Sequence, residues 1–267
     1  MNYKNSERIG NKQKFTEKEK EFRRTIPKNS IMGMRLDGRS FHTFTKQFER
    51  PYDRTLMKAM DAAAITIVSK VLDNSMFAYV QSDEINVFFS DLITVKRQFE
   101  FSGREEKLLS ISASGATGGF MKNCPKTKGI PMFDARLFHL KNCDELQEYM
   151  DYRRLDARKN AATMAASVLY SHKKLMHLKN DERLDLLKGT EYEKLPEDFF
   201  NGRLIVKENY EADITYFHKK ERKEKTQHVI RSRWKVEPAL RDRTEEIVKS
   251  FRERIAKTSR GLILAKG

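Results

Sequence analysis

Two apolar runs rich in β-forming residues lie on either side of a short acidic tip. Residues 76–81 read MFAYVQ, the tip is Ser82-Asp83-Glu84, and residues 85–90 read INVFFS. Apolar runs joined by a few polar residues predict a β-hairpin. This segment constrains the fold more than any other, because it sets two antiparallel neighbours of a sheet and places carboxylates at the turn between them.

A strand and a helix are predicted just before this hairpin. Residues 31–36 read IMGMRL, a short β-rich run that ends at Asp37-Gly38. After Pro51 a stripe of apolar residues recurs at helical spacing, with Asp53 as the expected N-cap. The stripe consists of Leu56, Met60, Ala63, Ile67 and Val71, widened by Ala64 and Val68. The predicted order is therefore strand, helix, strand, turn, strand.

The rest of the chain alternates between helical and strand-like segments. A first helix is expected within 104–122, a segment that looks helical at first and then turns glycine-rich at Gly115, Gly118 and Gly119. Further helices are expected at 144–179 and 239–257. Further strands are expected at 131–140, 204–209, 214–219 and 227–236. Alanines at 161, 162, 165 and 166 predict a close-packed face on the second helix. No internal repeat and no low-complexity linker divides the chain. The mixture of helical and strand-like segments indicates the α+β fold class.

Composition excludes several classes of protein. Hydrophobic residues make up 39% of the 267 residues, enough for a core and too many for a disordered basic tail. No apolar run approaches the roughly 20 residues that a membrane span needs, and the charged first 24 residues predict no secretory signal. The two cysteines, Cys124 and Cys143, form neither a disulfide framework nor a zinc motif. A cytoplasmic protein without a membrane partner is expected.

The formal charge of +15 is concentrated at the two ends. Residues 1–35 carry 10 Lys/Arg against 4 Asp/Glu, and residues 203–267 carry 18 against 10. A polyanion such as RNA that contacts both ends would account for this distribution. Solvated helix faces that keep the protein in solution account for it equally well.

Two carboxylates, Asp37 and Asp83, are the main candidates for chemistry. Each follows a predicted strand, and a β–α–β arrangement can bring their strands side by side. Carboxylate oxygens at adjacent strand ends suit Mg²⁺, and two such ions roughly 4 Å apart can clamp the oxygens of a phosphoryl transfer. The Gly38 carbonyl is a candidate for a further ligand, and the amides of residues 39–42 are candidates for contacting a triphosphate.

Taken singly, these signals have ordinary structural interpretations. An Asp-Gly pair after a strand is usually a turn, and an acidic hairpin tip is usually solvated. His42 alone is more often structural than a ligand. Trp234, among basic residues, suits either a base-stacking role or the edge of the core, and SGATGG at 114–119 lacks the Lys-Ser/Thr of a phosphate-binding loop.

Two long motifs stand out: RLDGRSFHTFTKQFERPYDRTLMKAMDAAA from residue 35 and FAYVQSDEINVFF from residue 77. Together they carry a resemblance to the tRNA-His guanylyltransferase family and its guanylyltransferase-like relatives. It continues through GREEKLLSISAS at 103–114, FDARLFHL at 133–140 and YMDYRRLDARKNA at 149–161, and more loosely to residue 206. It implies a palm-like antiparallel sheet with helices packed on it, in three parts: a basic N-terminal extension (1–30), a catalytic domain (31–206) and a basic C-terminal extension packed on that domain (207–267).

The resemblance also implies roles for individual residues. Asp37, the Gly38 carbonyl and Asp83 would hold two Mg²⁺ ions, and Glu84 would be the third catalytic acid, acting indirectly. The implied nucleotide contacts are Asp37, Gly38, Arg39, Ser40, Phe41, His42, Ser82, Asp83 and Lys107. Arg104, Ser110 and Ser114 match the same stretch as Lys107, where an ordinary helix surface is the alternative.

The implied activity is nucleotide addition to the 5′ end of tRNA, in the 3′-to-5′ direction. A nucleoside triphosphate, usually ATP, activates the 5′ end, and the 3′-hydroxyl of an incoming nucleotide, usually GTP, displaces the activating group. The resemblance further implies a homotetramer built from dimers. Two alternatives remain open: another palm enzyme such as a nucleotide cyclase, and a non-catalytic RNA-binding protein that keeps the fold.

One stretch departs from part of the family. Eukaryotic members that act only on tRNA-His carry His-Ile-Asn-Asn in the long helix, where this chain reads Arg158-Lys159-Asn160-Ala161. Relatives that differ at this place favour template-dependent repair of truncated tRNA. The departure concerns the choice of tRNA and leaves Asp37 and Asp83 unaffected, so the repair-type branch is expected.

Overall fold

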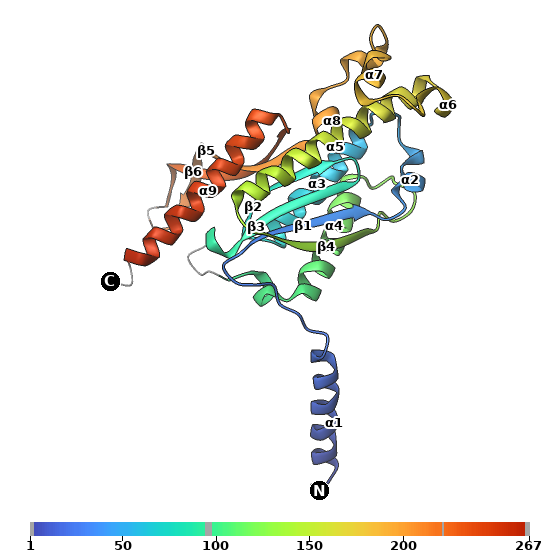
Figure 1. The fold of residues 1–267 in the computed structure, drawn as a ribbon. Helices are drawn as coiled ribbons and strands as arrows, with labels where there is room; N and C mark the ends of the chain where they lie inside the picture. The colour runs from blue at the N-terminus through green and yellow to red at the C-terminus, as the bar shows by residue number, and fades with distance from the viewer. Residues whose placement is uncertain (1–2, 94–97, 221, 265–267) are drawn as a thin grey trace.

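A six-stranded antiparallel sheet forms the centre of the protein, with strand order β4-β1-β3-β2-β5-β6 (Figure 1). The computed structural model describes residues 3–93, 98–220 and 222–264. The strands are β1 (Ile31–Gly38), β2 (Ser75–Gln81), β3 (Glu84–Ser90), β4 (Phe133–Leu140), β5 (Arg203–His218) and β6 (Lys223–Pro238). The α-helices are α1 (Tyr3–Lys20), α2 (Phe41–Phe44), α3 (Arg54–Lys70), α4 (Glu105–Asn123), α5 (Cys143–Leu169), α6 (His172–Leu175), α7 (Asn180–Asp185), α8 (Glu197–Asn201) and α9 (Arg241–Leu264). Short 3-10 helices are η1 (Thr45–Gln47), η2 (Asp91–Ile93), η3 (Glu100–Gly103) and η4 (Glu191–Lys194).

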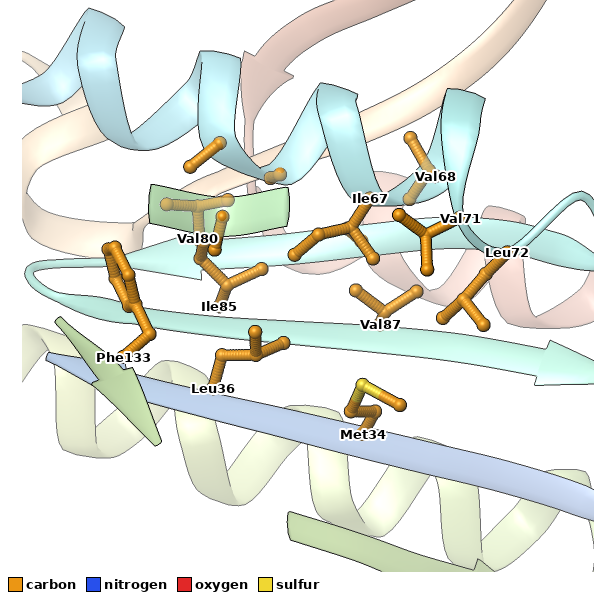
Figure 2. Close-up of a cluster of buried hydrophobic side chains, with 14 of the residues drawn as sticks. Met34, Leu36, Ile67, Val68, Val71, Leu72, Val80, Ile85, Val87 and Phe133 are labelled. Atoms are coloured by element: carbon orange, nitrogen blue, oxygen red, sulfur yellow. The ribbon is translucent and has the colours of Figure 1, made fainter. Parts of the chain in front are cut away.

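Helices cover both faces of the sheet. On one face α3 and α4 pack against the sheet, and Figure 2 shows side chains of β1, β2 and β3 meeting the apolar stripe of α3. On the other face α5 and α9 enclose a second core that includes Phe77, Phe88 and Phe251. Because both faces are covered, every residue of β3 is buried. The antiparallel α+β fold expected from the sequence is confirmed.

The helix before the hairpin begins where its capping residue predicts. Asp53 accepts hydrogen bonds from the amides of Thr55 and Leu56, at 2.7 and 2.9 Å, and α3 starts at Arg54. The cap satisfies two amides that have no partner inside the helix. The predicted stripe then faces the sheet, with Met60, Ala63 and Ile67 fully buried.

The glycine-rich segment is a correction to the sequence-based expectation. The helix does not give way there, since α4 runs without a break from Glu105 to Asn123. A Cβ on Gly119 would lie 2.4 Å from Thr66 Oγ1, so the glycine lets α4 approach α3 closely. The low helix propensity of glycine is overridden by this packing.

Three other boundaries differ from the expectation. The long helix ends at Leu169, and the short helices α6 and α7 follow it. The expected strands 204–209 and 214–219 are one continuous strand, β5, paired along its whole length with β6. The hairpin tip has two residues, because Glu84 already pairs with Gln81 as the first residue of β3.

The ends of the chain are helical. Figure 1 shows α1 extending away from the body of the protein, whereas α9 lies along α5. Ile247, Val248 and Phe251 of α9 are buried in the second core. None of the described helices is both long and apolar enough to cross a membrane.

Candidate active site

Asp37 and Asp83 meet at one end of the sheet. Asp37 is the penultimate residue of β1 and lies directly opposite Glu84 of β3. Asp83 lies in the two-residue turn between β2 and β3, and its carbonyl accepts a hydrogen bond of 3.1 Å from the Gly38 amide. Asp83 is thus joined by a backbone hydrogen bond to Gly38, the residue that follows Asp37, although 45 positions separate Gly38 and Asp83 in the sequence.

The backbone after Asp37 is tightly packed. A Cβ on Gly38 would lie 2.3 Å from the Phe41 ring, so only glycine fits between the strand and α2. Ser40 has a left-handed conformation with φ 57° and precedes α2. The Arg39 amide donates to the Met132 carbonyl at 2.8 Å. The expectation that all amides of residues 39–42 face a triphosphate is therefore wrong for Arg39, whose amide is already bonded.

The Asp83 carboxyl group is mostly buried and lies near two other acids. Burial raises the pKa of its carboxyl group, and the nearby carboxylates Asp37 and Glu84 add to the rise, while hydrogen bonds from its own amide and from Ser82 oppose it. The Asp37 carboxylate has a cationic partner, since Arg35 Nη2 lies 3.1 Å from its Oδ2 atom. The site thus holds a partly buried acid that a bound cation would stabilise.

Glu84 points into the protein rather than into the site. Its Oε1 atom accepts a hydrogen bond of 2.7 Å from Asn86, and its Oε2 atom one of 2.5 Å from Arg153 of α5. Arg35 Nε lies 3.3 Å from the same Oε2 atom. Glu84 is therefore engaged by protein groups, which agrees with an indirect role and leaves Asp37 and Asp83 as the acids available to a metal.

The residues at this end of the sheet fit divalent metal ions. Mg²⁺ prefers carboxylate and carbonyl oxygens and retains water or phosphate oxygens as its other ligands. Asp37 and Asp83 supply two carboxylates, and burial raises the pKa of Asp83, so a bound cation would stabilise its charged form. The Gly38 carbonyl, at the end of β1, is the third oxygen that the sequence suggests.

A cavity of about 380 Å³ adjoins Asp83. Phe41, His42 and Ser82, expected from the sequence as nucleotide contacts, line it together with Asp83. Other lining residues come from distant segments: Thr45, Glu49, Arg50, Pro51, Asp53, Leu56, Met57, Gln81, Ala157, Asn160, Ala161, Met164, Asp198, Phe199, Gly202 and Arg203. Arg39 and Ser40 are exposed beside α2 and do not line it among the described residues.

Lys107 lies away from the acidic end of the sheet. It is in the first turn of α4, beside Arg104, whose backbone pairs with Thr25. The part of α4 that approaches the acidic end is its last turns, where Phe120 contacts Phe41. Thirteen residues of helix separate Lys107 from Phe120, roughly 20 Å along the axis. The described chain therefore does not bring Lys107 to Asp37 and Asp83.

The other residues singled out in the sequence lie within helices α4 and α5 or at the edge of the first core. Ser110 and Ser114 bond carbonyls of their own helix, and SGATGG lies inside α4. Trp234 is half-buried at the edge of the first core. Arg158 donates to the Asn201 side chain at 3.1 Å, whereas Asn160 and Ala161 line the cavity.

Three functional candidates were not singled out in the sequence: Arg153, Asp198 and Arg203. A pattern exists for Arg153, since it falls on the buried stripe of α5 between Met150 and Ala157 and is a charge where an apolar residue is expected. Asp198 and Arg203 offer no such signal. They lie more than 110 residues from Asp83 in the sequence and reach the cavity through the α8–β5 connection.

Comparisons with known proteins agree with this geometry. Residues 14–141 match the family described as tRNAHis guanylyltransferase. The chain is 35% identical over 144 residues to a tRNA(His) guanylyltransferase of Schizosaccharomyces pombe, an alignment that covers 51% of this chain and about half, 52%, of that protein.

Solved structures extend the similarity over nearly the whole chain. A bacterial tRNA(His) guanylyltransferase-like protein in complex with ATP superposes with a TM-score of 0.72 at 27% identity, covering 90% of this chain and 97% of that one. The complex of such a bacterial protein with GTP gives a TM-score of 0.69 at the same identity and coverage. In sequence, fold and acidic site, the chain is similar to the tRNA-His guanylyltransferase family.

Proposed function

We propose that this protein is a nucleotidyltransferase that adds GTP-derived or templated nucleotides to the 5′ end of tRNA in the 3′-to-5′ direction. The observation that carries the proposal is the junction of Asp37 and Asp83 through the 3.1 Å hydrogen bond between the Gly38 amide and the Asp83 carbonyl. This junction lies beside a cavity that Asp83 and Ser82 help to line. Family relatives that bind ATP and GTP support the nucleotide class.

Asp37, the Gly38 carbonyl and Asp83 would hold two Mg²⁺ ions in this proposal. Bound metal would supply neutralisation of phosphate charge and activation of a hydroxyl group. The chain itself would position the reactants, because phosphoryl transfer depends mainly on positioning and electrostatics. Phe41, His42 and Ser82 line the cavity in which the nucleotide would lie, and Glu84 would hold Arg35 and Arg153 in place behind the acids.

The acceptor is proposed to be a tRNA of the repair-type branch. Asn160 and Ala161 line the cavity where other members of the family carry their tRNA-His-specific motif. A template-dependent enzyme needs no contact specific to one tRNA, which fits this difference. A homotetramer, a cytoplasmic location and the three-part division of the chain belong to the same proposal.

One incorporation assay tests the activity. The full chain is incubated with Mg²⁺, labelled GTP and a tRNA that lacks its first nucleotide. We expect label at the 5′ end of the RNA. A cyclic nucleotide formed without RNA would instead identify a cyclase, and tight tRNA binding without incorporation would identify a binding protein.

Two variants test the metal assignment. Asp37→Ala and Asp83→Ala should each abolish incorporation while leaving tRNA binding nearly unchanged. Asp185→Ala is the matched control, since Asp185 is an exposed acid of α7 paired with Lys188. Near-normal incorporation by either of the first two variants would show that the assigned carboxylates do not hold the metal.

A further inference from the structure

Two cavities share a polar wall beside the acidic site. The cavity next to Asp83 and a second one of about 430 Å³ are both lined by Met57, Asp198 and Arg203. Arg203 Nη2 and Asp198 Oδ1 are buried atoms without a hydrogen-bond partner among the described residues. A buried donor and a buried acceptor that the described residues leave without partners thus belong to two residues that line the same two cavities. Such atoms are costly unless a ligand or solvent satisfies them.

Arg203 is held rigidly in this wall. Its Nε atom lies 2.6 Å from Asp61 Oδ1 of α3, and the residue is only 4% exposed. Arg203 lies at the start of β5, directly opposite Val80 of β2, so the sheet fixes its backbone. The ion pair with Asp61 fixes the side chain. The Nη2 atom of the same guanidinium group is thereby held in place and keeps its donor capacity unused by the described residues. A preorganised donor of this kind gives specificity at little entropic cost.

Asp198 supplies the complementary acceptors. It lies in the first turn of α8, and the neighbouring Phe199 contributes an aromatic ring to the same cavity. Leu56, Met57 and Met164 add apolar surface. A flat ring with polar atoms on its edge fits this combination of apolar walls and paired polar groups. Asp83 lines the same cavity, and Arg203 pairs with Val80, three residues before Asp83. A nucleoside triphosphate with its phosphates at the acids would therefore extend its base towards Asp198 and Arg203.

We propose that Asp198 and Arg203 read the edge of the nucleobase, and that this cavity prefers guanine to adenine. The inference rests on the proposed function, since it concerns the nucleotide bound beside Asp37 and Asp83. The Asp198 carboxylate accepts hydrogen bonds from N1–H and the 2-amino group of guanine. Arg203 Nη2 donates to O6.

The charge of Asp198 distinguishes the two purines. A carboxylate offers only acceptors, and guanine presents two adjacent donors to it. Adenine presents one donor, its 6-amino group, next to the N1 acceptor, which a carboxylate oxygen repels. The buried acceptor is then left partly unsatisfied, and this is how a polar site rejects a close analogue.

Nucleotide analogues test the contact without changing the protein. Binding of GTP, ITP and ATP to the full chain is measured by calorimetry in Mg²⁺ without RNA. ITP lacks only the 2-amino group, so its dissociation constant should exceed that of GTP by roughly 10- to 100-fold. ATP should bind more weakly than GTP. Equal affinities for the three nucleotides, or tighter binding of ATP, would overturn the inference.

The variant Asp198→Asn completes the test. It should weaken GTP binding to about the level of ITP and leave ITP binding nearly unchanged, because the lost acceptor is the partner of the 2-amino group. Asp185→Asn, the same change on an exposed residue of α7, should preserve the preference for GTP. If Asp198→Asn weakens both nucleotides equally, Asp198 does not read the base. Incorporation by the wild type is measured in parallel, so that failure of the base assignment is distinguished from failure of the proposed activity.

Discussion

The Glu84 carboxylate lies 2.5 Å from Arg153 Nη2, and this contact joins the acidic hairpin to α5. The side chains are 9% and 8% exposed, so the ion pair is buried. Tyr149 of α5 strengthens the junction, since its hydroxyl donates to the Asn86 side chain at 2.7 Å. Burial raises the pKa of Tyr149 to about 12, and the nearby Glu84 carboxylate contributes, so this donor stays protonated at neutral pH. The position of the hairpin thus depends on a helix that begins 59 residues later in the chain.

Removing one partner of this buried pair should destabilise the protein. Arg153→Met leaves Glu84 buried with less compensation, and the expected loss is about 3 kcal/mol in the free energy of unfolding, measured by urea titration. The control is Arg136→Met, because Arg136 pairs with Asp134 and both side chains are 55% exposed. That change should cost less than about 1 kcal/mol. Equal losses for the two variants would mean that Arg153 is not the partner that holds Glu84.

The raised pKa of Asp83 predicts a gain in stability when its charge is removed. A raised pKa means that the folded state binds the proton more tightly than the unfolded chain, so stability falls as pH rises past the ordinary range of the carboxyl group. Asp83→Asn should therefore have a higher melting temperature than the wild type at neutral pH without divalent cations. The difference should shrink in acid, where the wild-type carboxyl is protonated.

Metal binding should reverse this order. Mg²⁺ at about 100 times its dissociation constant would stabilise the wild type by roughly 2.7 kcal/mol, and Asp83→Asn should lose most of that gain. Thermal unfolding with and without MgCl₂ measures both effects. A variant that is stabilised by Mg²⁺ as strongly as the wild type would place the metal away from Asp83.

The acidic site could be predicted from the sequence because its parts are local. Asp37 and Asp83 each follow a run of apolar residues, and strand order alone brings them together. The surroundings of Glu84 could not be predicted in the same way, because Arg153 reaches it from another helix. The polar wall of Asp198 and Arg203 also depends on tertiary contacts, chiefly the ion pair between Arg203 and Asp61.

The glycine-rich part of α4 shows how tertiary packing overrides a local signal. Gly118 is exposed and Gly119 is buried, although they are neighbours in one helix. Nothing lies within 4 Å of a Cβ built on Gly118, whereas one on Gly119 would lie 3.0 Å from the Ala62 carbonyl oxygen and closer still to Thr66. The sequence shows two equivalent glycines, and only the contact with α3 distinguishes them.

Alanine at these two positions should therefore act in opposite directions. Gly118→Ala should raise the free energy of unfolding by about 0.5–1 kcal/mol, because alanine favours an exposed helix interior. Gly119→Ala should lower it by about 1–3 kcal/mol, because α3 and α4 must move apart. Urea unfolding of the two variants measures the difference. Stabilisation by both substitutions would contradict the close approach of the helices.

The basic C-terminal helix requires a test that preserves the fold. Deletion of residues after about 240 would expose the second core, because Ile247, Val248 and Phe251 of α9 are buried there. A loss of tRNA binding after such a deletion would not separate charge from folding. Single charges on the exposed face of α9 are therefore the better targets.

Neutralising Lys249 and Lys257 should weaken tRNA binding through lost phosphate contacts. Both are exposed residues of α9, so Lys249→Gln with Lys257→Gln removes charge and leaves the buried face intact. Each lost phosphate contact should reduce the slope of log affinity against log salt by roughly 0.7–0.9. Filter binding across a salt series measures the slope. The control is Lys188→Gln, which removes an exposed charge near α7. An unchanged slope for the double variant, or an equal decrease for the control, would show that α9 is only a solvated surface.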